Sequence, residues 1–463
     1  GKQKLENSWK LLKEKTQRRS HQAEAEWIYI GGKTMRTNEL MLYKHMENGQ
    51  ILQDITFLIE NYQNDYYNME DMKGLLYDAV NEILEMAVSH GFEGDLWHNY
   101  LTYLMASHEN AYSTSCEIVG SVDGSINQVA LHDFEIFKEL FDYDFADMES
   151  VMGVDCISML HDYVGTSGHG SVFNQRIRDR ICDLSKSLAK AETAEEFKAV
   201  ITQFYKEFGV GKLGLHKAFR IAHTEEGALI EPITKIAHVH LDDLVGYEIA
   251  KKKLIDNTKA FVEGKKANNC LLFGDAGTGK SSSIKAILNQ YYDQGLRMIE
   301  VYKHQFQDLN DVIAQIKNRN YKFIIYMDDL SFEEFEIEYK YLKAVIEGGL
   351  EKKPDNVLIY ATSNRRHLIR ETFKDKEDRD EELHTNDTVQ EKLSLVARFG
   401  VTIYFGKPDK KQFQEIVREL AKKNGIDMSD DELFLEANKW ELSHGGLSGR
   451  TAQQFIDYLA GTR

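Results

Sequence analysis

One motif limits what this chain can fold into more than any other feature. The sequence GDAGTGKS at residues 274–281 fits the pattern GxxxxGK[ST], follows a short apolar run and precedes a segment, 282–291, with helical spacing. Glycines allow successive backbone N–H groups to curl around phosphate oxygens, and a helix N-terminus adds partial positive charge. We therefore expect a strand–loop–helix unit that holds the phosphates of a nucleotide.

The polar side chains of this loop have distinct expected roles. Lys280 is expected to reach the β and γ phosphates of a nucleoside triphosphate, and the Ser281 hydroxyl is expected to bind Mg²⁺. The residues predicted to contact the nucleotide here are Gly274, Asp275, Ala276, Gly277, Thr278, Gly279, Lys280, Ser281 and Ser282.

Five short apolar runs after residue 241 alternate with helix-length segments. They are 269–273, 298–302, 323–327, 357–361 and 401–405. Runs that are apolar almost throughout are typical of parallel strands covered on both faces, and parallel strands need crossover helices. The second half is therefore predicted to be an α/β layer with a five-stranded parallel sheet, followed from residue 409 by a helical lid.

The first half has a helical period. Leu76, Val80, Ile83 and Ala87 recur at spacings of three and four, and Gly91 follows where a C-cap is expected. A chain of 463 residues exceeds the size of a single core. The predicted domains are 1–34, a flexible or non-native arm; 35–238, mainly helical; 239–405, the P-loop core; and 406–463, the lid.

Two adjacent carboxylates end the third apolar run. A strand buried on both faces is expected to end in adjacent acids such as Asp328 and Asp329 where a cation balances their negative charge. Mg²⁺ with a polarised water would provide that charge. Asp328 is assigned to the metal and Asp329 to orienting or deprotonating the attacking water. By itself the pattern also fits a turn or a helix cap.

Three further residues extend the predicted site. Asn364 ends the fourth run, and strand ends of an open α/β sheet converge on one crevice, so its amide could orient water or sense the γ phosphate. Arg398 precedes the last run and Arg450 opens the final helix. Guanidinium groups stabilise the charge that develops on a transferring phosphoryl group. One of these two arginines could act on the nucleotide of a neighbouring subunit, and the other could act within the lid of its own chain. Each arginine could instead form a surface salt bridge.

The run from Leu241 to Arg463 resembles an AAA+ ATPase, and most closely a bacterial family known only as domain of unknown function 815, itself similar to helicase-loader and transposase-helper ATPases. Residues 241–246 resemble the box before the P-loop, and 274–281 and 323–329 resemble Walker A and Walker B. Residues 361–366, 391–400 and 448–450 resemble sensor 1, the arginine-finger segment and sensor 2.

The resemblance implies ATP as the ligand, with Val245 and Gly246 against adenine and Arg450 at the phosphates. It implies that Arg398 acts on the nucleotide of a neighbour, and hence a homo-oligomer, either a ring or an open spiral. One departure is that many AAA+ proteins have Glu where this chain has Asp329. This shorter carboxylate predicts either slow hydrolysis or a second water that bridges it to the attacking one. The implied catalytic residues are Lys280, Asp328, Asp329, Asn364, Arg398 and Arg450.

Composition leaves several functions open. A net charge of −18 disfavours non-specific binding to a polyanion, although a local basic patch can oppose the global sign. Four cysteines without a CxxC pair suit a reducing cytoplasm, and the sequence has no apolar run of about 18 residues. The expected function is remodelling of an unknown protein or nucleoprotein partner. The alternatives are a nucleotide-gated switch with little turnover, or a DNA-associated loader using Arg365, Arg366, His367 and Arg370.

Overall fold

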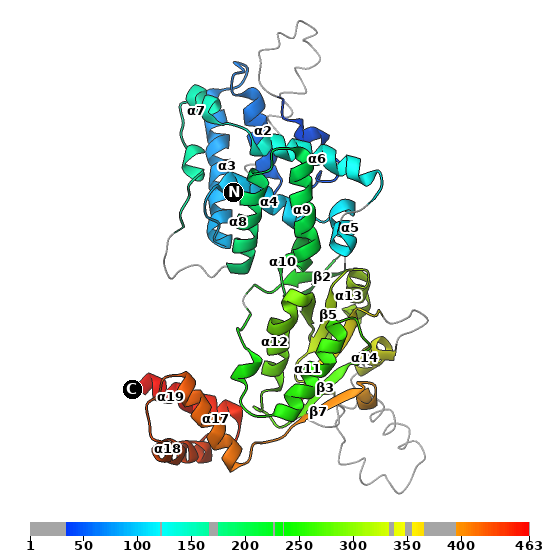
Figure 1. Cartoon of the computed structure of the whole chain (residues 1–463), viewed down its shortest axis with the longest axis vertical. Helices are drawn as coiled ribbons and strands as arrows, with labels where there is room; N and C mark the ends of the chain where they lie inside the picture. The colour runs from blue at the N-terminus through cyan, green and yellow to red at the C-terminus, as the bar shows by residue number, and fades with distance from the viewer. Residues whose placement is uncertain are drawn as a thin grey trace.

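The computed structural model describes residues 34–120, 123–165, 175–225, 227–234, 236–332, 338–347, 354–364 and 395–462. Helices of the N-terminal half lie at one end of the long axis, an α/β layer follows, and the C-terminal helices form a group at the other end (Figure 1). Residues 1–33 of the predicted arm and the basic residues Arg365, Arg366, His367 and Arg370 lie outside the described residues.

The helical unit is residues 34–215. Its helices are α2 (Gln50–Asn61), α3 (Met69–His90), α4 (Leu96–Ser107), α5 (Ala111–Val119), α6 (Ile126–Phe141), α7 (Ala146–Met152), α8 (Gln175–Ala189), α9 (Ala194–Phe208) and α10 (Gly211–Leu215), with the 3₁₀ turns η1 (Arg36–Glu39) and η2 (Ser158–Leu160). Asn68 caps α3 through its side chain, and Gly91 ends it at φ 73°, as predicted. The apolar stripe of α3, including Leu76 and Ile83, is buried in a core rich in aromatic residues.

The α/β layer is built on one mixed sheet. Its strands are β1 (Ala218–Thr224), β2 (Gly227–Pro232), β3 (Cys270–Gly274), β4 (Leu296–Glu300), β5 (Lys322–Met327), β6 (Val357–Ser363) and β7 (Val401–Phe405). The order across the sheet is β2-β1-β4-β5-β6-β3-β7. The crossover and flanking helices are α11 (Glu248–Val262), α12 (Lys280–Tyr291), α13 (Leu309–Ile316) and α14 (Glu338–Glu347), with η3 (Leu241–Asp243), η4 (Tyr292–Gln294) and η5 (Lys303–Asp308).

The five predicted strands are present and parallel, in the order β4-β5-β6-β3-β7. The prediction of a five-stranded sheet was wrong in number, because seven strands pair among the described residues. The hairpin β1–β2 adds the other two, β1 parallel to β4 and β2 antiparallel to β1. β1 is mostly exposed toward its end, so it lacks the continuous apolar run that marks a strand covered on both faces.

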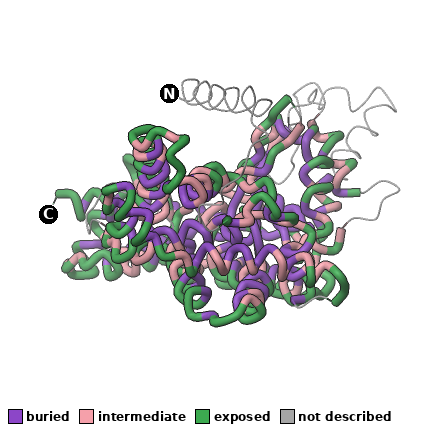
Figure 2. Tube along the Cα trace, turned by 90° about the horizontal axis from the view of Figure 1, so that it is seen from above, coloured by how far each residue is buried: buried purple, intermediate pink, exposed green. Residues whose placement is uncertain are grey.

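The lid has its own small core. Its helices are α17 (Lys410–Lys423), α18 (Asp430–Ser443) and α19 (Gly449–Thr462). Asp409 begins α17 with a capping box, and Phe413, Ala437 and Ile456 from the three helices pack together. Figure 2 shows buried positions through the interior of the trace, with exposed ones on the outer helix faces and turns. The predicted domain boundaries at 238/239 and 405/406 stay predictions, and β1 and β2 lie on the N-terminal side of the first.

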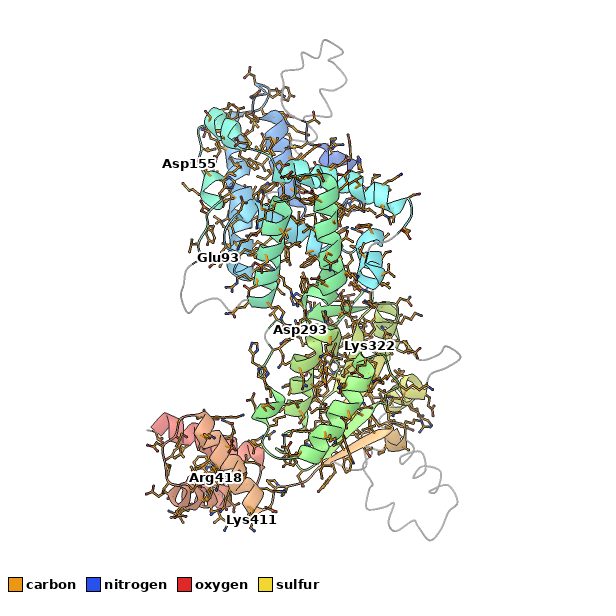
Figure 3. The ribbon with its side chains drawn as sticks, viewed as in Figure 1. Glu93, Asp155, Asp293, Lys322, Lys411 and Arg418 are labelled. Carbon is orange, nitrogen blue, oxygen red and sulfur yellow. The ribbon has the colours of Figure 1, made fainter. Side chains whose placement is uncertain are left out.

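Ion pairs join the helical unit to the α/β layer. Arg319, just before β5, donates to Glu117 of α5 at 2.8 Å and 3.1 Å and to Glu109 at 2.8 Å. Asp293 lies where the helical unit meets the layer (Figure 3), and Arg176 approaches it at 3.2 Å. β5 is therefore held at its N-terminal end by the helical unit.

Among the described residues, the helices are all too short or too polar to cross a membrane.

Candidate functional site

Close backbone contacts shape the phosphate-binding loop. β3 ends at Gly274, whose φ is 135° and whose added Cβ would lie 2.1 Å from the backbone oxygen of Phe405 in β7, so a side chain does not fit. The N–H of Asp275 donates to the same oxygen at 3.0 Å. α12 begins at Lys280, directly after Gly279 at φ 91°. The predicted strand–loop–helix unit is therefore present, with the N-terminus of α12 at the carboxyl edge of the sheet.

Lys280 points back across this loop. Its Nζ donates to the backbone oxygens of Gly274 at 3.0 Å and Asp275 at 2.6 Å, and to Oδ1 of Asn364 at 3.0 Å. Burial lowers the pKa of Lys280, and the nearby carboxylates of Asp329 and Asp275 oppose that shift. Because these three acceptors are neutral oxygens, a phosphate arriving here would gain a charge-assisted bond.

One carboxylate oxygen of Asp328 accepts hydrogen bonds from two hydroxyl groups. Ser281 Oγ donates to its Oδ1 at 2.7 Å, and Thr362 Oγ1 donates to the same atom at 2.6 Å. Burial raises the pKa of Asp328, but the hydrogen bonds from Thr362 and Ser281 oppose this shift, and the pKa lies below its usual value, so the carboxylate is ionised. A hydroxyl and an ionised carboxylate at a phosphate loop are the donor set that Mg²⁺ takes in nucleotide sites, so these residues fit that ion.

Asp329 has a backbone conformation that is uncommon for a residue with a side chain. Its φ is 49°, and its N–H donates to Thr362 Oγ1 at 2.9 Å. Its Oδ1 accepts from Asn364 Nδ2 at 2.8 Å. The amide of Asn364 therefore links Lys280 to Asp329, and β3, β5 and β6 deliver their polar ends to one place.

These groups line one cavity of about 650 Å³ between the sheet edge and the lid. Of the predicted site residues, those in its wall are Val245, Ala276, Gly277, Thr278, Gly279, Lys280, Ser281, Ser282, Asp328, Asp329, Asn364 and Arg450. Gly246, Gly274, Asp275 and Arg398 lie outside this wall. The structure thus brings most of the predicted residues together, while their roles toward a nucleotide stay predictions.

Three of the four residues outside the wall determine the path of the backbone next to it. Asp275 turns its carboxylate away to accept from the N–H of Lys407 at 2.9 Å. Gly246 has a φ of 82° and is followed by Tyr247 at φ 59°, a left-handed pair that turns the chain into α11. Together with Gly274 at the end of β3, they set the backbone path rather than presenting a side chain.

The lid contacts the phosphate-binding loop directly. The N–H of Arg450 donates to the backbone oxygen of Gly277 at 3.1 Å. A Cβ added to Gly449 would lie 3.3 Å from that oxygen, so the two backbones approach closely at the start of α19. On the other side of the cavity, Lys423 of α17 pairs with Asp243 of η3 at 3.1 Å. A ligand in the cavity would therefore touch the layer and the lid at once.

Arg398 is the predicted site residue that stays away from the cavity of its own chain. Its Nε and Nη2 donate to Glu347 Oε1 at the end of α14, and its side chain is about a quarter exposed. The salt bridge that the sequence left open as an alternative is thus present. A role on the nucleotide of a neighbouring subunit stays a prediction, as it requires a second chain.

The sequence prediction missed several wall residues. Thr362 stands two positions before Asn364 in the same polar strand end, and that position was the available signal. Tyr247 packs against Phe405 at 5.3 Å between ring centroids, and its hydroxyl donates to the backbone of Gly406 at 3.0 Å. Further missed wall residues are Asp243, Leu244, Lys251, Ile416, Leu420 and Gln453.

The strand order, the glycine-rich loop between β3 and α12 and the helical lid define the P-loop core and lid of the AAA+ class. Residues 214–463 match a family described as protein of unknown function, DUF815. This match spans more than half of the chain, and the protein belongs to that family.

Two solved structures are similar to parts of this chain. A point variant of RuvB from Thermotoga maritima is 17% identical with a TM-score of 0.34, over 47% of this chain and 63% of that one. The FIGL-1 AAA domain in complex with ADP is 16% identical with a TM-score of 0.35, over 49% and 75%. This chain therefore spans less than two thirds of the length of that RuvB. No curated protein matches the chain.

Proposed function

We propose that this protein binds and hydrolyses ATP with Mg²⁺ and couples turnover to the remodelling of a protein or nucleoprotein partner. One observation carries the proposal. Lys280 at the start of α12, the acids Asp328 and Asp329 after β5, and Asn364 after β6 meet at one cavity, to whose wall the lid contributes Arg450. A cavity that combines an ammonium, two carboxylates and a helix N-terminus suits a magnesium-bound triphosphate better than any neutral ligand.

The residues of this site would have separate roles toward the nucleotide, the metal ion and the attacking water. Lys280 would exchange its carbonyl partners for the β and γ phosphates, and Ser281 and Asp328 would hold Mg²⁺, which supplies charge neutralisation to the phosphates when bound. Asp329 would orient or deprotonate the attacking water, held at its place by Asn364. Val245 in the wall, with Gly246 next to it in the chain, would accommodate the adenine.

The position of Arg398 is the reason for proposing an oligomer. Its guanidinium lies outside the cavity of its own chain and is paired with Glu347 near the surface. An arginine in that place could reach the nucleotide of a neighbouring copy, where it would stabilise charge on the transferring phosphoryl group. We therefore propose a homo-oligomer with sites shared between subunits, acting in the cytoplasm.

A second candidate is a nucleotide-gated switch with little turnover. The observation that favours it is the carboxylate of Asp329, which is short, sits on a backbone at φ 49° and is engaged by Asn364. In that case binding of ATP would order the lid over the loop, through contacts such as Arg450 to Gly277, without a fast chemical step.

Nucleotide binding and turnover test the proposal. Isothermal titration is expected to show magnesium-dependent ATP binding that is lost in Lys280→Ala and kept in Lys259→Ala, a control on the exposed face of α11. Turnover is expected to fall by roughly 10³-fold in Arg398→Ala, given the usual contribution of such an arginine, and to stay near wild type in Arg418→Ala. Absence of any ATP uptake by the wild-type protein would refute both candidates.

Mixing variants separates a shared site from a local one. Subunits carrying Lys280→Ala and subunits carrying Arg398→Ala are each expected to be inactive, but a mixture should regain part of the activity. The reason is that a mixed interface joins an intact Lys280 to an intact Arg398. Recovery in the mixture contradicts a role for Arg398 within its own chain, whereas tight binding with negligible turnover in every form selects the switch.

The partner is to be sought with a stalled variant. Asp329→Asn removes the base while keeping the size of the side chain, so it is expected to bind ATP and hold its partner. Proteins that copurify with it, and not with Lys280→Ala, are the candidate partners. For the DNA-loader alternative, affinity for a DNA duplex that falls steeply with salt is the expected sign.

A further inference from the structure

Thr362 occupies a place in this site that the proposed roles leave unexplained. It lies in β6, is 2% exposed, and its hydroxyl sits between the two acids at the end of β5. Oγ1 is 2.6 Å from Asp328 Oδ1 and 2.9 Å from the backbone N of Asp329. The backbone oxygen of the same residue accepts from the N–H of Leu330 at 2.7 Å.

The direction of these bonds follows from the chemistry of the groups. A backbone N–H can only donate, so Thr362 Oγ1 accepts from Asp329 and its single proton points to Asp328. That oxygen of Asp328 also accepts from Ser281 at 2.7 Å. One hydroxyl therefore fixes the backbone of one acid and the carboxylate of the other.

The backbone of Asp329 needs such support. At φ 49° it lies in the left-handed region, which is disfavoured for residues with a side chain and persists where surrounding contacts impose it. The N–H groups of Asp329 and Leu330 both donate to Thr362, the first to its Oγ1 and the second to its backbone oxygen. The side chain of Asp329 then extends toward Asn364, which holds its Oδ1 at 2.8 Å.

We propose that Thr362 is the positioning residue of this site, whose hydroxyl holds Asp328 oriented toward Mg²⁺ and Asp329 oriented toward the attacking water. The proposal rests on the proposed ATPase function. In this proposal Thr362 acts through the two acids and not on the reacting atoms. Its contribution is geometric, since a displacement of about 1 Å in a catalytic group can lower a rate by about 10²-fold.

Two substitutions at this position separate the hydroxyl from the shape of the side chain. Thr362→Val keeps the branched shape but can neither accept from Asp329 nor donate to Asp328. Thr362→Ser keeps the hydroxyl and loses a methyl group. The kcat of Thr362→Val is expected to fall by about 10²-fold, whereas Thr362→Ser is expected to retain kcat within about threefold.

Thr258→Val is the matched control. Thr258 is also fully buried, its hydroxyl bonds to Tyr360 at 2.9 Å and to the backbone of Leu254 at 2.8 Å, and it packs against the same strand from α11. Its removal is expected to lower the melting temperature about as much as Thr362→Val does. It should leave kcat near the wild-type value, because it touches neither acid.

Binding with and without Mg²⁺ gives a readout that does not depend on turnover. Because the Asp328 carboxylate loses its orienting bond, Thr362→Val is expected to lose most of the increase in ATP affinity that Mg²⁺ confers, while affinity measured in EDTA stays within about twofold. A wild-type kcat and a wild-type Mg²⁺ effect in Thr362→Val would overturn the inference. That result leaves the proposed function standing as long as Lys280→Ala remains inactive, so the two failures are distinguishable.

Discussion

Replacing Arg319 tests how the helical unit is held against the α/β layer. Arg319 is 13% exposed at its side chain and pairs with Glu117, which is 2% exposed, through two hydrogen bonds at 2.8 Å and 3.1 Å. Arg319→Met would leave the Glu117 carboxylate buried without its cationic partner, while the N–H of Val210 still donates to it at 3.1 Å. Breaking a buried pair in this way costs about 3–5 kcal/mol, a large share of a domain stability of about 5–15 kcal/mol.

The double variant provides the internal check. Adding Glu117→Gln to Arg319→Met removes the unpaired charge while the new amide oxygen can still accept from Val210, so the double variant is expected to be more stable than Arg319→Met alone. The exposed pair Arg220–Glu231 is the control, since Arg220→Met should cost less than about 1 kcal/mol. Urea unfolding followed by circular dichroism measures these three variants, Glu117→Gln alone and the wild type. A loss below about 1 kcal/mol for Arg319→Met, or additive losses in the double variant, would refute the reasoning.

Three further predictions concern the loop, the metal and the pH dependence. Gly274→Ala places a Cβ 2.1 Å from the Phe405 oxygen and is expected to abolish ATP binding in titration calorimetry while the helical unit keeps its circular dichroism signal. In Asp328→Asn, ATP affinity is expected to become nearly independent of Mg²⁺, measured by titration in Mg²⁺ and in EDTA. Burial lowers the pKa of His216 to about 4, below the ordinary value near 6.5, so the unfolded chain takes up its proton first and stability falls as pH drops from about 6.5 to about 4, by about 3 kcal/mol. In His216→Phe this part of the loss, followed by urea unfolding at each pH, is expected to disappear.

The parts of the site that the sequence predicted are those governed by local chemistry. The glycines from Gly274 to Gly279 could be predicted because a loop that curls around phosphate needs positive φ angles, which are 135° at Gly274, 75° at Gly277 and 91° at Gly279. Their close contacts with Phe405 of β7 and with Ser448 and Arg450 of the lid came only from the tertiary structure. The strands β3, β4, β5 and β6 could be predicted because a strand covered on both faces is apolar almost throughout. β7, at the edge of the sheet, was predicted from its apolar run although Thr402 and Tyr404 are exposed. The hairpin β1–β2 escaped prediction because it is partly exposed, so its pattern is mixed and only pairing with β4 makes it part of the sheet.

The sequence by itself determined the strand–loop–helix unit at Lys280 and the presence of acids at a strand end, because each follows from residues close together in the chain. Only the tertiary structure decided that Thr362 bridges Asp328 and Asp329, that Ile416 and Leu420 of the lid face the cavity, and that Arg398 pairs with Glu347. The reason is physical: a hydrogen bond between side chains more than thirty positions apart depends on strand register and on how helices dock, and neither quantity is encoded in a local pattern.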